Sequence, residues 1–267
     1  MRREMTTILH TIAEHAQQRV ADAQKKVPTE ILRAKAESMA CGTGFPFERA
    51  IADANDLAFI CECKKASPSR GVIAETYDPV GIARAYEEAG ATCLSVLTEP
   101  RWFLGEDRHL TEVTAAVSIP CLRKDFTVDP YMVYEAKLLG ASAVLLICAL
   151  LSTEELRAYL ALCDHLGLSA LVEAHDEIEI ESALHAGARI VGVNHRNLRD
   201  FTVDTTHSAR LRALVPPGVL YVAESGIQTP AEVDALRQLP VDAVLVGETL
   251  MRAPDKKAAL ETLRGGR

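Results

Sequence analysis

The chain has 267 residues, of which 48% are hydrophobic and 25% are charged, a balance typical of globular proteins. This composition excludes a disordered, collagen-like or coiled-coil chain, and the length suits one large domain or two small ones. The formal net charge of −8 argues against nucleic acid or a membrane as a partner, because proteins that bind them are usually basic. A small anionic substrate is compatible with locally clustered basic residues.

Residues 1–56 precede the first predicted strand and carry three helical patterns. Apolar residues in 8–16 form one stripe, Pro28 interrupts the pattern, and a second stripe occupies 31–40. Residues 46–51 indicate a further short helix. The apolar content is too small for an independent domain, so we interpret this segment as a helical extension that caps the mouth of the domain that follows.

Eight short apolar segments in residues 57–267 are predicted to be β-strands, and helical patterns separate them. Many are apolar on both faces, as buried parallel strands are. The segments are Leu57–Lys64, Cys93–Thr98, Pro120–Lys124, Ala143–Cys148, Ala170–Glu173, Ile190–Asn194, Leu220–Glu224 and Ala243–Gly247. Eight such units in series favour an α/β fold, a (β/α)8 TIM barrel in a single domain over residues 1–267, rather than an open doubly wound sheet.

Helix boundaries support this alternation. Asp78, Asp129 and Thr229 each precede a proline, the pattern of an N-cap followed by proline in the first turn. Ser152 and Glu155 have the spacing of a capping box. Glycine, which supplies the left-handed residue of a C-cap, ends four helical patterns at Gly90, Gly140, Gly167 and Gly187.

The seven cysteines indicate a reducing, cytoplasmic environment. Cys61 and Cys63 form the one close pair, and no second pair or nearby histidine completes a zinc site. Several of the others lie in apolar runs and are expected to be buried free thiols. The longest apolar run, 141–151, is too short to span a bilayer, and no signal peptide is expected.

Polar residues gather at the carboxyl ends of the predicted strands, where (β/α)8 barrels bind their ligands. They are Glu62, Lys64, Lys124, Glu173, Asn194, Glu224 and Ser225. Alternation places Glu62 and Lys64 on the inner face, and this pair is either a structural ion pair or part of the chemistry. A lysine among carboxylates can act as a general acid opposite a glutamate base, and a Schiff base on either lysine is the alternative.

Two glycines favour a phosphate site. Gly226 and Gly247 follow the seventh and eighth predicted strands, where backbone N–H groups can meet an anion without a side-chain clash. Ser67, after the first strand, can close this site, and the loop from Ser67 to Thr76 is a candidate lid. His175 and His195 lie near the rim without an obvious partner, and no metal-binding histidine motif occurs.

Together these segments resemble the indole-3-glycerol phosphate synthase family. The resemblance rests on Glu62–Ser69, Leu122–Phe126, Leu171–His175, Gly192–Leu198, Ala223–Ile227 and Val246–Met251, which recur in order. It implies a carboxy-lyase of tryptophan biosynthesis, which closes the ring of 1-(2-carboxyphenylamino)-1-deoxy-D-ribulose 5-phosphate and releases carbon dioxide and water. It implies no metal and no organic cofactor.

The resemblance also implies roles for individual residues. Lys124 would be the general acid on the ketone oxygen, Glu173 the acid and base in loss of the hydroxyl, and Lys64 would hold the carboxylate or share the proton transfer. Substrate positioning would fall to Glu62, Asn194, Ser225, Glu224 and Arg196. Phosphate would be bound by Ser67, Gly226, Gly247 and the Glu248 backbone N–H.

Two positions depart from the family pattern, and two other functions stay open. His195 stands where a second asparagine is common, and Glu248 replaces a common serine, so its side chain is expected to point away from phosphate. A phosphoribosyl sugar isomerase could use Glu62 and Glu173, although the two lysines argue against it. An inactive barrel serving as a subunit of a pathway complex is the other alternative. We expect a monofunctional chain without a fused isomerase barrel, as a monomer or weak homodimer.

Overall fold

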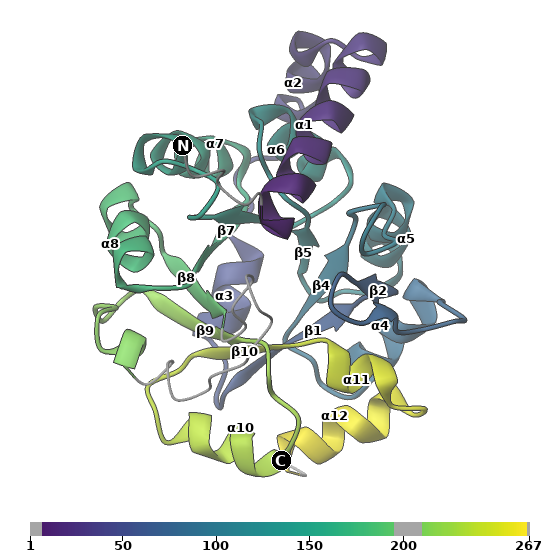
Figure 1. The fold of residues 1–267 in the computed structure, drawn as a ribbon, viewed down its shortest axis with the longest axis vertical. Coiled ribbons are helices and arrows are strands. Elements are labelled where there is room, and N and C mark those ends of the chain that lie inside the picture. The colour runs from purple at the N-terminus through teal and green to yellow at the C-terminus, as the bar shows by residue number, and fades with distance from the viewer. Residues whose placement is uncertain (1–6, 195–209, 266–267) are drawn as a thin grey trace, which may run out of the picture.

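The computed structural model describes residues 7–194 and 210–265, and in these residues eight parallel strands close into a barrel (Figure 1). Around the barrel the strand order is β1, β10, β9, β8, β7, β6, β5, β4. Their bounds are β1 Ala58–Cys63, β4 Cys93–Leu97, β5 Cys121–Lys124, β6 Ala143–Ile147, β7 Ser169–Ala174, β8 Ile190–Asn194, β9 Leu220–Glu224 and β10 Ala243–Val246. Each predicted strand is present, and the (β/α)8 fold is confirmed.

Helices alternate with the strands and surround the barrel (Figure 1). Their bounds are α4 Pro79–Glu88, α5 Asp107–Ala116, α6 Pro130–Leu138, α7 Thr153–Leu166, α8 Glu177–Ala186, α10 Pro230–Arg237, α11 Glu248–Arg252 and α12 Lys256–Arg264. The predicted caps are confirmed: the Asp78 carboxylate accepts from a first-turn N–H, and Ser152 and Thr229 form capping boxes. The four predicted C-terminal glycines all have positive φ.

The barrel interior is filled by aliphatic side chains, and its polarity changes along the strands. Ile60, Leu122, Leu145 and Leu171 are buried in the centre of the barrel. The cysteines of β1 point outward, into the cluster between barrel and helices, as strand alternation predicts. Toward the carboxyl ends the inward positions become polar, so the strands deliver their charged side chains to one rim.

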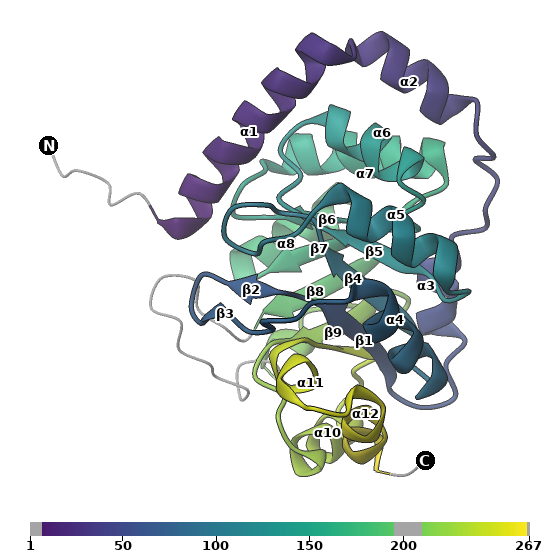
Figure 2. The ribbon, with the colours of Figure 1, turned by 90° about the vertical axis from the view of Figure 1, so that its right-hand side faces the viewer.

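The N-terminal extension covers both ends of the barrel (Figure 2). α1 (Ile8–Lys26) lies at the mouth, where its apolar face lines a cavity. α2 (Thr29–Glu37) packs on α6. α3 (Pro46–Ala52) closes the opposite end, because Phe47 and Ile51 enter the barrel core and hydrogen bonds join α3 to the first residues of β4 and β7. The predicted cap at the mouth is thus α1, whereas α3 is a plug at the other end.

A short hairpin follows β1 at the mouth (Figure 2). β2 (Ala66–Ser67) and β3 (Gly71–Val72) pair antiparallel, inside the segment expected to be a loop. The Ala66 N–H donates to the Phe103 carbonyl at 3.1 Å, which joins the hairpin to the loop after β4. The candidate lid therefore contains regular structure that is anchored to a neighbouring loop.

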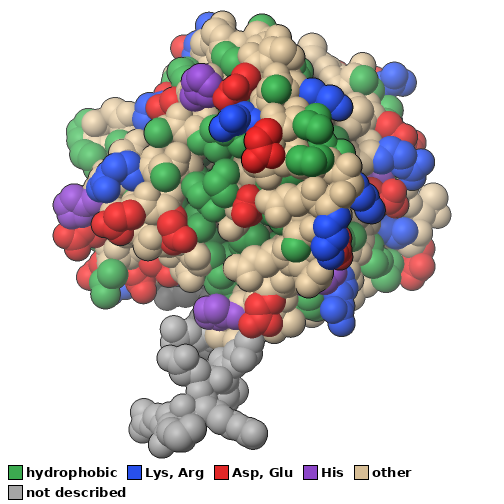
Figure 3. All heavy atoms as spheres, turned by 90° about the horizontal axis from the view of Figure 1, so that it is seen from above, with side chains coloured by type: hydrophobic (Ala, Val, Ile, Leu, Met, Phe, Trp, Pro, Cys, Tyr) green, Lys and Arg blue, Asp and Glu red, His purple; other side chains and the backbone are tan. Residues whose placement is uncertain are grey.

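Charges of both signs are interspersed on the face shown in Figure 3, and hydrophobic side chains gather toward its middle. Among the described residues, no helix combines the length and the apolar character that a membrane crossing requires.

Candidate active site

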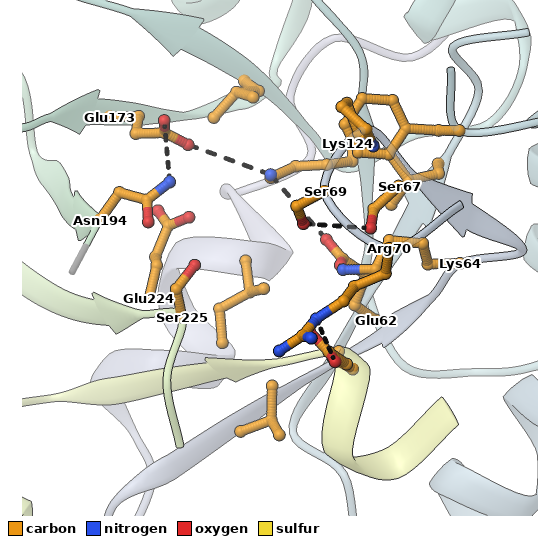
Figure 4. A pocket seen from close by; sticks show the side chains of 18 of the residues that line it. Glu62, Lys64, Ser67, Ser69, Arg70, Lys124, Glu173, Asn194, Glu224 and Ser225 are labelled. Atoms are coloured by element: carbon orange, nitrogen blue, oxygen red, sulfur yellow. Dashed lines mark hydrogen bonds and ion pairs between the residues drawn. The ribbon is translucent and has the colours of Figure 1, made fainter. Parts of the chain in front are cut away.

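A cavity of about 630 Å³ lies at the carboxyl ends of the strands, within the size range of small-molecule sites. One part of its wall is apolar and includes Ile8, Leu9, Ile12, Phe103, Phe126, Leu145 and Ile147. The rest is polar, and Figure 4 shows side chains from several strands pointing into it. The described residues predicted for the site all line it: Glu62, Lys64, Ser67, Lys124, Glu173, Asn194, Glu224, Ser225, Gly226, Gly247 and Glu248. Arg196 and His195 lie outside the described residues.

Glu62 joins the two lysines. Lys64 Nζ donates to Glu62 Oε1 at 2.5 Å, and Lys124 Nζ lies 3.8 Å from Glu62 Oε2. Burial alone would raise the pKa of Glu62, but the charges of Lys64 and Lys124 outweigh it and hold that pKa below its usual value. A Cβ on Gly247 would collide with Glu62 Oε1, so a larger residue there would force this pair to shift. The ion pair considered from the sequence exists, and it lies inside the cavity.

Lys124 lies between two carboxylates. Its Nζ is 4.0 Å from Glu173 Oε2 as well as 3.8 Å from Glu62, and Figure 4 shows it reaching between them. Burial would lower its pKa, yet the negative charges of Glu62 and Glu173 outweigh burial and raise that pKa. Lys124 is therefore held as an ammonium ion.

Glu173 is oriented by two neighbours. Asn194 Nδ2 donates to Glu173 Oε1 at 3.3 Å, and His175 Nε2 lies 3.4 Å from the same oxygen. His175 Nδ1 is 3.0 Å from Glu179 Oε2 at the start of α8. Burial lowers the pKa of His175, but the bond to Glu179 and the nearby carboxylates raise it to about 8. Sequence reasoning left His175 without a partner, although Glu173 and Glu179 lie only two and four residues away in the chain.

Glu224 differs from the other two glutamates. It is 2% exposed, and its Oε1 has no hydrogen-bond partner among the described residues. Burial and then the charge of Glu173 raise its pKa to about 8, despite the attraction of Lys124. This shift favours the protonated form of the carboxyl. Gly192 makes room for it, because a Cβ there would collide with Glu224 Oε1.

The end of the cavity where the sequence predicts phosphate to bind, called the phosphate end below, holds Ser67, Gly226 and Gly247 from three loops. Ser225, just before Gly226, has a φ of 67°, a left-handed conformation that is unusual for serine and often marks functional loops. Glu248 was expected to turn its side chain away. Glu248 is among the residues that line the cavity, and its carboxylate pairs with Arg70 and Arg252, which offset its charge.

A buried ion-pair network fixes α1 beside Lys124. Arg19 of α1 donates to both carboxylate oxygens of Asp125, at 3.1 and 2.6 Å, and Thr98 Oγ1 donates to Asp125 at 2.8 Å. Burial would raise the pKa of Asp125, but Arg19 and Arg123 lower it. Because Asp125 follows Lys124 directly, this network holds the end of β5 and the helix above the cavity as one unit.

Within residues 7–194 and 210–265, no group of three or more His, Cys, Asp and Glu side chains is placed to hold a metal ion. A closed (β/α)8 barrel whose cavity gathers a lysine ammonium, buried glutamates and glycine-bearing loops at the carboxyl ends of its strands has the architecture of an enzyme that acts on a small molecule.

Comparison with known proteins agrees with this class. The model of the indole-3-glycerol phosphate synthase family matches residues 9–263. Indole-3-glycerol phosphate synthase from Ruminiclostridium cellulolyticum is 54% identical over 97% of this chain and 99% of its own, and that from Lachnoclostridium phytofermentans is 46% identical over 96% and 98%. The chain belongs to the indole-3-glycerol phosphate synthase family. Thiamine phosphate pyrophosphorylase from Pyrococcus furiosus shares only the fold, with a TM-score of 0.59 and 18% identity over 78% of this chain and 94% of that chain.

Proposed function

We propose that the charged groups of the cavity carry out the family's reaction on 1-(2-carboxyphenylamino)-1-deoxy-D-ribulose 5-phosphate. The reaction is a carboxy-lyase step of tryptophan biosynthesis that yields indole-3-glycerol phosphate, carbon dioxide and water. The observation that carries the proposal is the Lys124 ammonium, 3.8 Å from Glu62 and 4.0 Å from Glu173. An acid and a base this close can act on neighbouring atoms of one substrate.

Lys124 is the proposed general acid of ring closure. It donates a proton to the ketone oxygen as the aromatic carbon attacks the ketone carbon, so a carbon–carbon bond forms and the ketone becomes a hydroxyl. Its raised pKa keeps the ammonium charged before the step. The same shift disfavours a Schiff base, which needs a neutral amine.

Lys64 and Glu173 are proposed to assist the loss of carbon dioxide and the loss of water, respectively. Lys64 is proposed to hold the substrate carboxylate until it leaves as carbon dioxide, while its bonding electrons return to the ring. Glu173 is proposed to take a proton from the carbon next to the one that bears the hydroxyl and to give it to the hydroxyl, which leaves as water while a double bond forms between the two carbons. Asn194 and His175 lie beside Glu173 and are proposed to orient it. Glu62 keeps both lysines in place.

Glu224, Ser225 and Asn194 are proposed to bind the sugar hydroxyls. The protonated Glu224 can donate a hydrogen bond there, which an ionised carboxylate cannot. Phosphate is proposed to bind to the Ser67 hydroxyl and to the backbone N–H groups of Gly226, Gly247 and Glu248. The apolar wall beneath α1 suits the aromatic ring of the substrate. Arg196 stays a proposed anion contact outside the described residues.

The direct test is an indole fluorescence assay with the purified chain, the substrate and EDTA. Trp102 is the single tryptophan, so the protein background is low. We expect indole-3-glycerol phosphate to accumulate. Folded protein that yields none would contradict the proposal, and phosphoribosyl sugar isomerase substrates would then be tested.

We also propose a cytoplasmic monomer or weak homodimer that folds as one domain over residues 1–267. Seven free cysteines support a reducing compartment, and the packing of α1 and α3 into the barrel core supports one domain. Sedimentation measured over a range of protein concentrations tests the oligomeric state.

A further inference from the structure

Arg70 connects the two sides of the cavity mouth. It lies in the turn of the β2–β3 hairpin, where its N–H donates to the Ser67 carbonyl at 3.3 Å. Its Nε lies 3.0 Å from Glu248 Oε1, on α11. Figure 4 shows the Arg70 side chain extending from the hairpin into the pocket. Gly71 beside it has a φ of +65°, which glycine adopts without strain, so the local sequence favours the turn that presents Arg70.

A second arginine shares the same carboxylate. Arg252 Nε donates to Glu248 Oε1 at 3.1 Å, and all three residues line the cavity. The side chains of Arg70 and Arg252 are 52% and 53% exposed. One carboxylate between two guanidinium groups leaves a net charge of +1 at the phosphate end. Glu248 is thus compatible with a bound anion, although a lone carboxylate there would repel it.

The other groups proposed for phosphate carry no charge. They are the Ser67 hydroxyl and backbone N–H groups, whereas a phosphate monoester carries nearly two negative charges at neutral pH. The two lysines of the cavity are already engaged with Glu62. Arg70 contacts Glu248 through Nε, so within residues 7–194 and 210–265 its two terminal nitrogens remain available, and a guanidinium binds two phosphate oxygens at once.

We propose that Arg70 is a phosphate-binding residue of this enzyme and that Glu248 is its positioning residue. The proposal rests on the proposed function, because it concerns the phosphate end assigned there. Glu248 holds Arg70 across the mouth before the substrate arrives, and Arg252 offsets the charge of Glu248. The bound phosphate then receives hydrogen bonds from the terminal nitrogens of Arg70, which ties the hairpin and α11 to the same ligand.

The first test removes the charge of Arg70. In Arg70→Gln we expect the KM for the substrate to rise about tenfold or more, with kcat within about twofold of wild type. The dissociation constant of inorganic phosphate, measured by calorimetry, rises by a similar factor. Arg108→Gln is the matched control, because Arg108 is a 68% exposed, ion-paired arginine outside the cavity. A phosphate affinity of Arg70→Gln within about twofold of wild type would overturn the proposal.

The second test separates positioning from repulsion. Glu248→Gln in the wild-type background releases Arg70, so we expect phosphate to bind more weakly. In the Arg70→Gln background the same change removes a negative charge and leaves Arg252 unpaired, so we expect phosphate to bind more tightly. This reversal of sign is the signature of positioning. An equal effect of the same sign in both backgrounds would show that Glu248 does not act through Arg70.

The role of Arg70 and the proposed function can be tested independently of each other. The calorimetric titration needs no turnover, so it decides the role of Arg70 even if no indole-3-glycerol phosphate forms. Conversely, an active wild type with an unaffected Arg70→Gln variant leaves the proposed function intact and removes only Arg70 from it.

Discussion

The two ends of the cavity differ in how far their charged side chains are buried. We call the end that holds Lys124 and the three glutamates the reaction end, and the phosphate end is the one that also holds Arg70 and Arg252. At the reaction end Glu62, Glu173 and Glu224 are at most 3% exposed, and Lys124 lies among them. At the phosphate end the two arginines are about half exposed. Burial strengthens the interaction between charges and shifts pKa values, whereas water and salt screen exposed charges. We infer that the reaction end is organised for proton transfer and the phosphate end for binding.

The largest expected effect comes from removing the acid at the buried end. Lys124→Ala is expected to lower kcat by about 10²–10⁴-fold, the range for loss of a general acid, while the phosphate affinity stays near wild type. The indole fluorescence assay measures the first, and calorimetry with inorganic phosphate measures the second. Lys257→Ala, a half-exposed lysine paired with Glu88, is the control. A variant that keeps most of its kcat would show that Lys124 only binds.

Glu173 and Glu224, both at the reaction end, are expected to differ in how much activity their amide variants lose. Glu173→Gln is expected to lower kcat by more than about 10²-fold, because an amide cannot take a proton. Glu224→Gln is expected to lose less than about tenfold at pH 7, because an amide still donates a hydrogen bond and matches the neutral charge of the protonated acid. Equal losses in the two variants would mean that Glu224 works as a carboxylate.

The pH dependence of kcat/KM sharpens this contrast. Glu224 has a pKa raised to about 8, so it is protonated below that value and ionises above it. We expect wild-type kcat/KM to fall above about pH 8 and the fall to disappear in Glu224→Gln. The groups that face Glu224 are Glu62, Lys124, Glu173 and His175.

His175 needs its own control, because its pKa is also raised to about 8. His175→Gln keeps a side chain that can donate to Glu173 but removes the titration. If Glu224 is responsible, the fall in kcat/KM above pH 8 persists in His175→Gln. The opposite pattern, loss in His175→Gln and persistence in Glu224→Gln, would assign the ionisation to the histidine.

A smaller effect is expected where the buried end meets α1. Asp125→Asn removes the carboxylate that Arg19 binds and that lies 3.9 Å from Arg123, whose ion pairs with Asp107 and Glu135 remain. We expect the free energy of unfolding at pH 7 to fall by about 2–3 kcal/mol, less than for a fully enclosed pair because Arg19 keeps some exposure. Urea unfolding measures it. Asp22→Asn, an exposed carboxylate paired with Lys25, is the control and should leave stability unchanged.

The ion pair between Asp125 and Arg19 also predicts that the free energy of unfolding depends on pH. The folded state lowers the pKa of Asp125 from its usual 3.8, so its stabilisation is present above that value and is lost as pH falls through the folded pKa. The difference between wild type and Asp125→Asn should therefore be full at pH 7 and shrink below about pH 4. A constant difference would mean that Asp125 stabilises through packing rather than charge.

The sequence predicts well which charged side chains meet in the cavity, and the reason is geometric. Parallel strands in a barrel bring their carboxyl ends to one rim, so charged residues such as Glu62, Lys124 and Glu173 that end apolar runs must converge. The same rule predicted Asn194 without any knowledge of its partner. Each of these positions depends on strand alternation, which a sequence shows directly.

The sequence did not predict side-chain contacts between separate elements, because hydrophobic periodicity carries no information about them. Arg19 and Asp125 are 106 residues apart, and nothing in the helical stripe of α1 marks Arg19 as buried. The pairing of Arg70 with Glu248 depends on the short β2–β3 hairpin, which the sequence suggested only as a loop. The four-residue spacing of His175 and Glu179 was a usable signal, but it lies across a strand end rather than on a helix face.

The smallest expected effect tests the exposed end by ionic strength alone. Between about 0.01 and 0.5 M salt the screening length falls severalfold, so attraction between Arg70 and the substrate phosphate weakens and KM should rise about threefold or more. The lysine and glutamates of the reaction end are shielded from solvent ions, so kcat should stay within about 1.5-fold over the same range. In Arg70→Gln the dependence of KM on salt should be shallower, because the charge that salt screens is gone. A kcat that follows salt as strongly as KM would mean that the two ends do not differ in their access to solvent once substrate is bound.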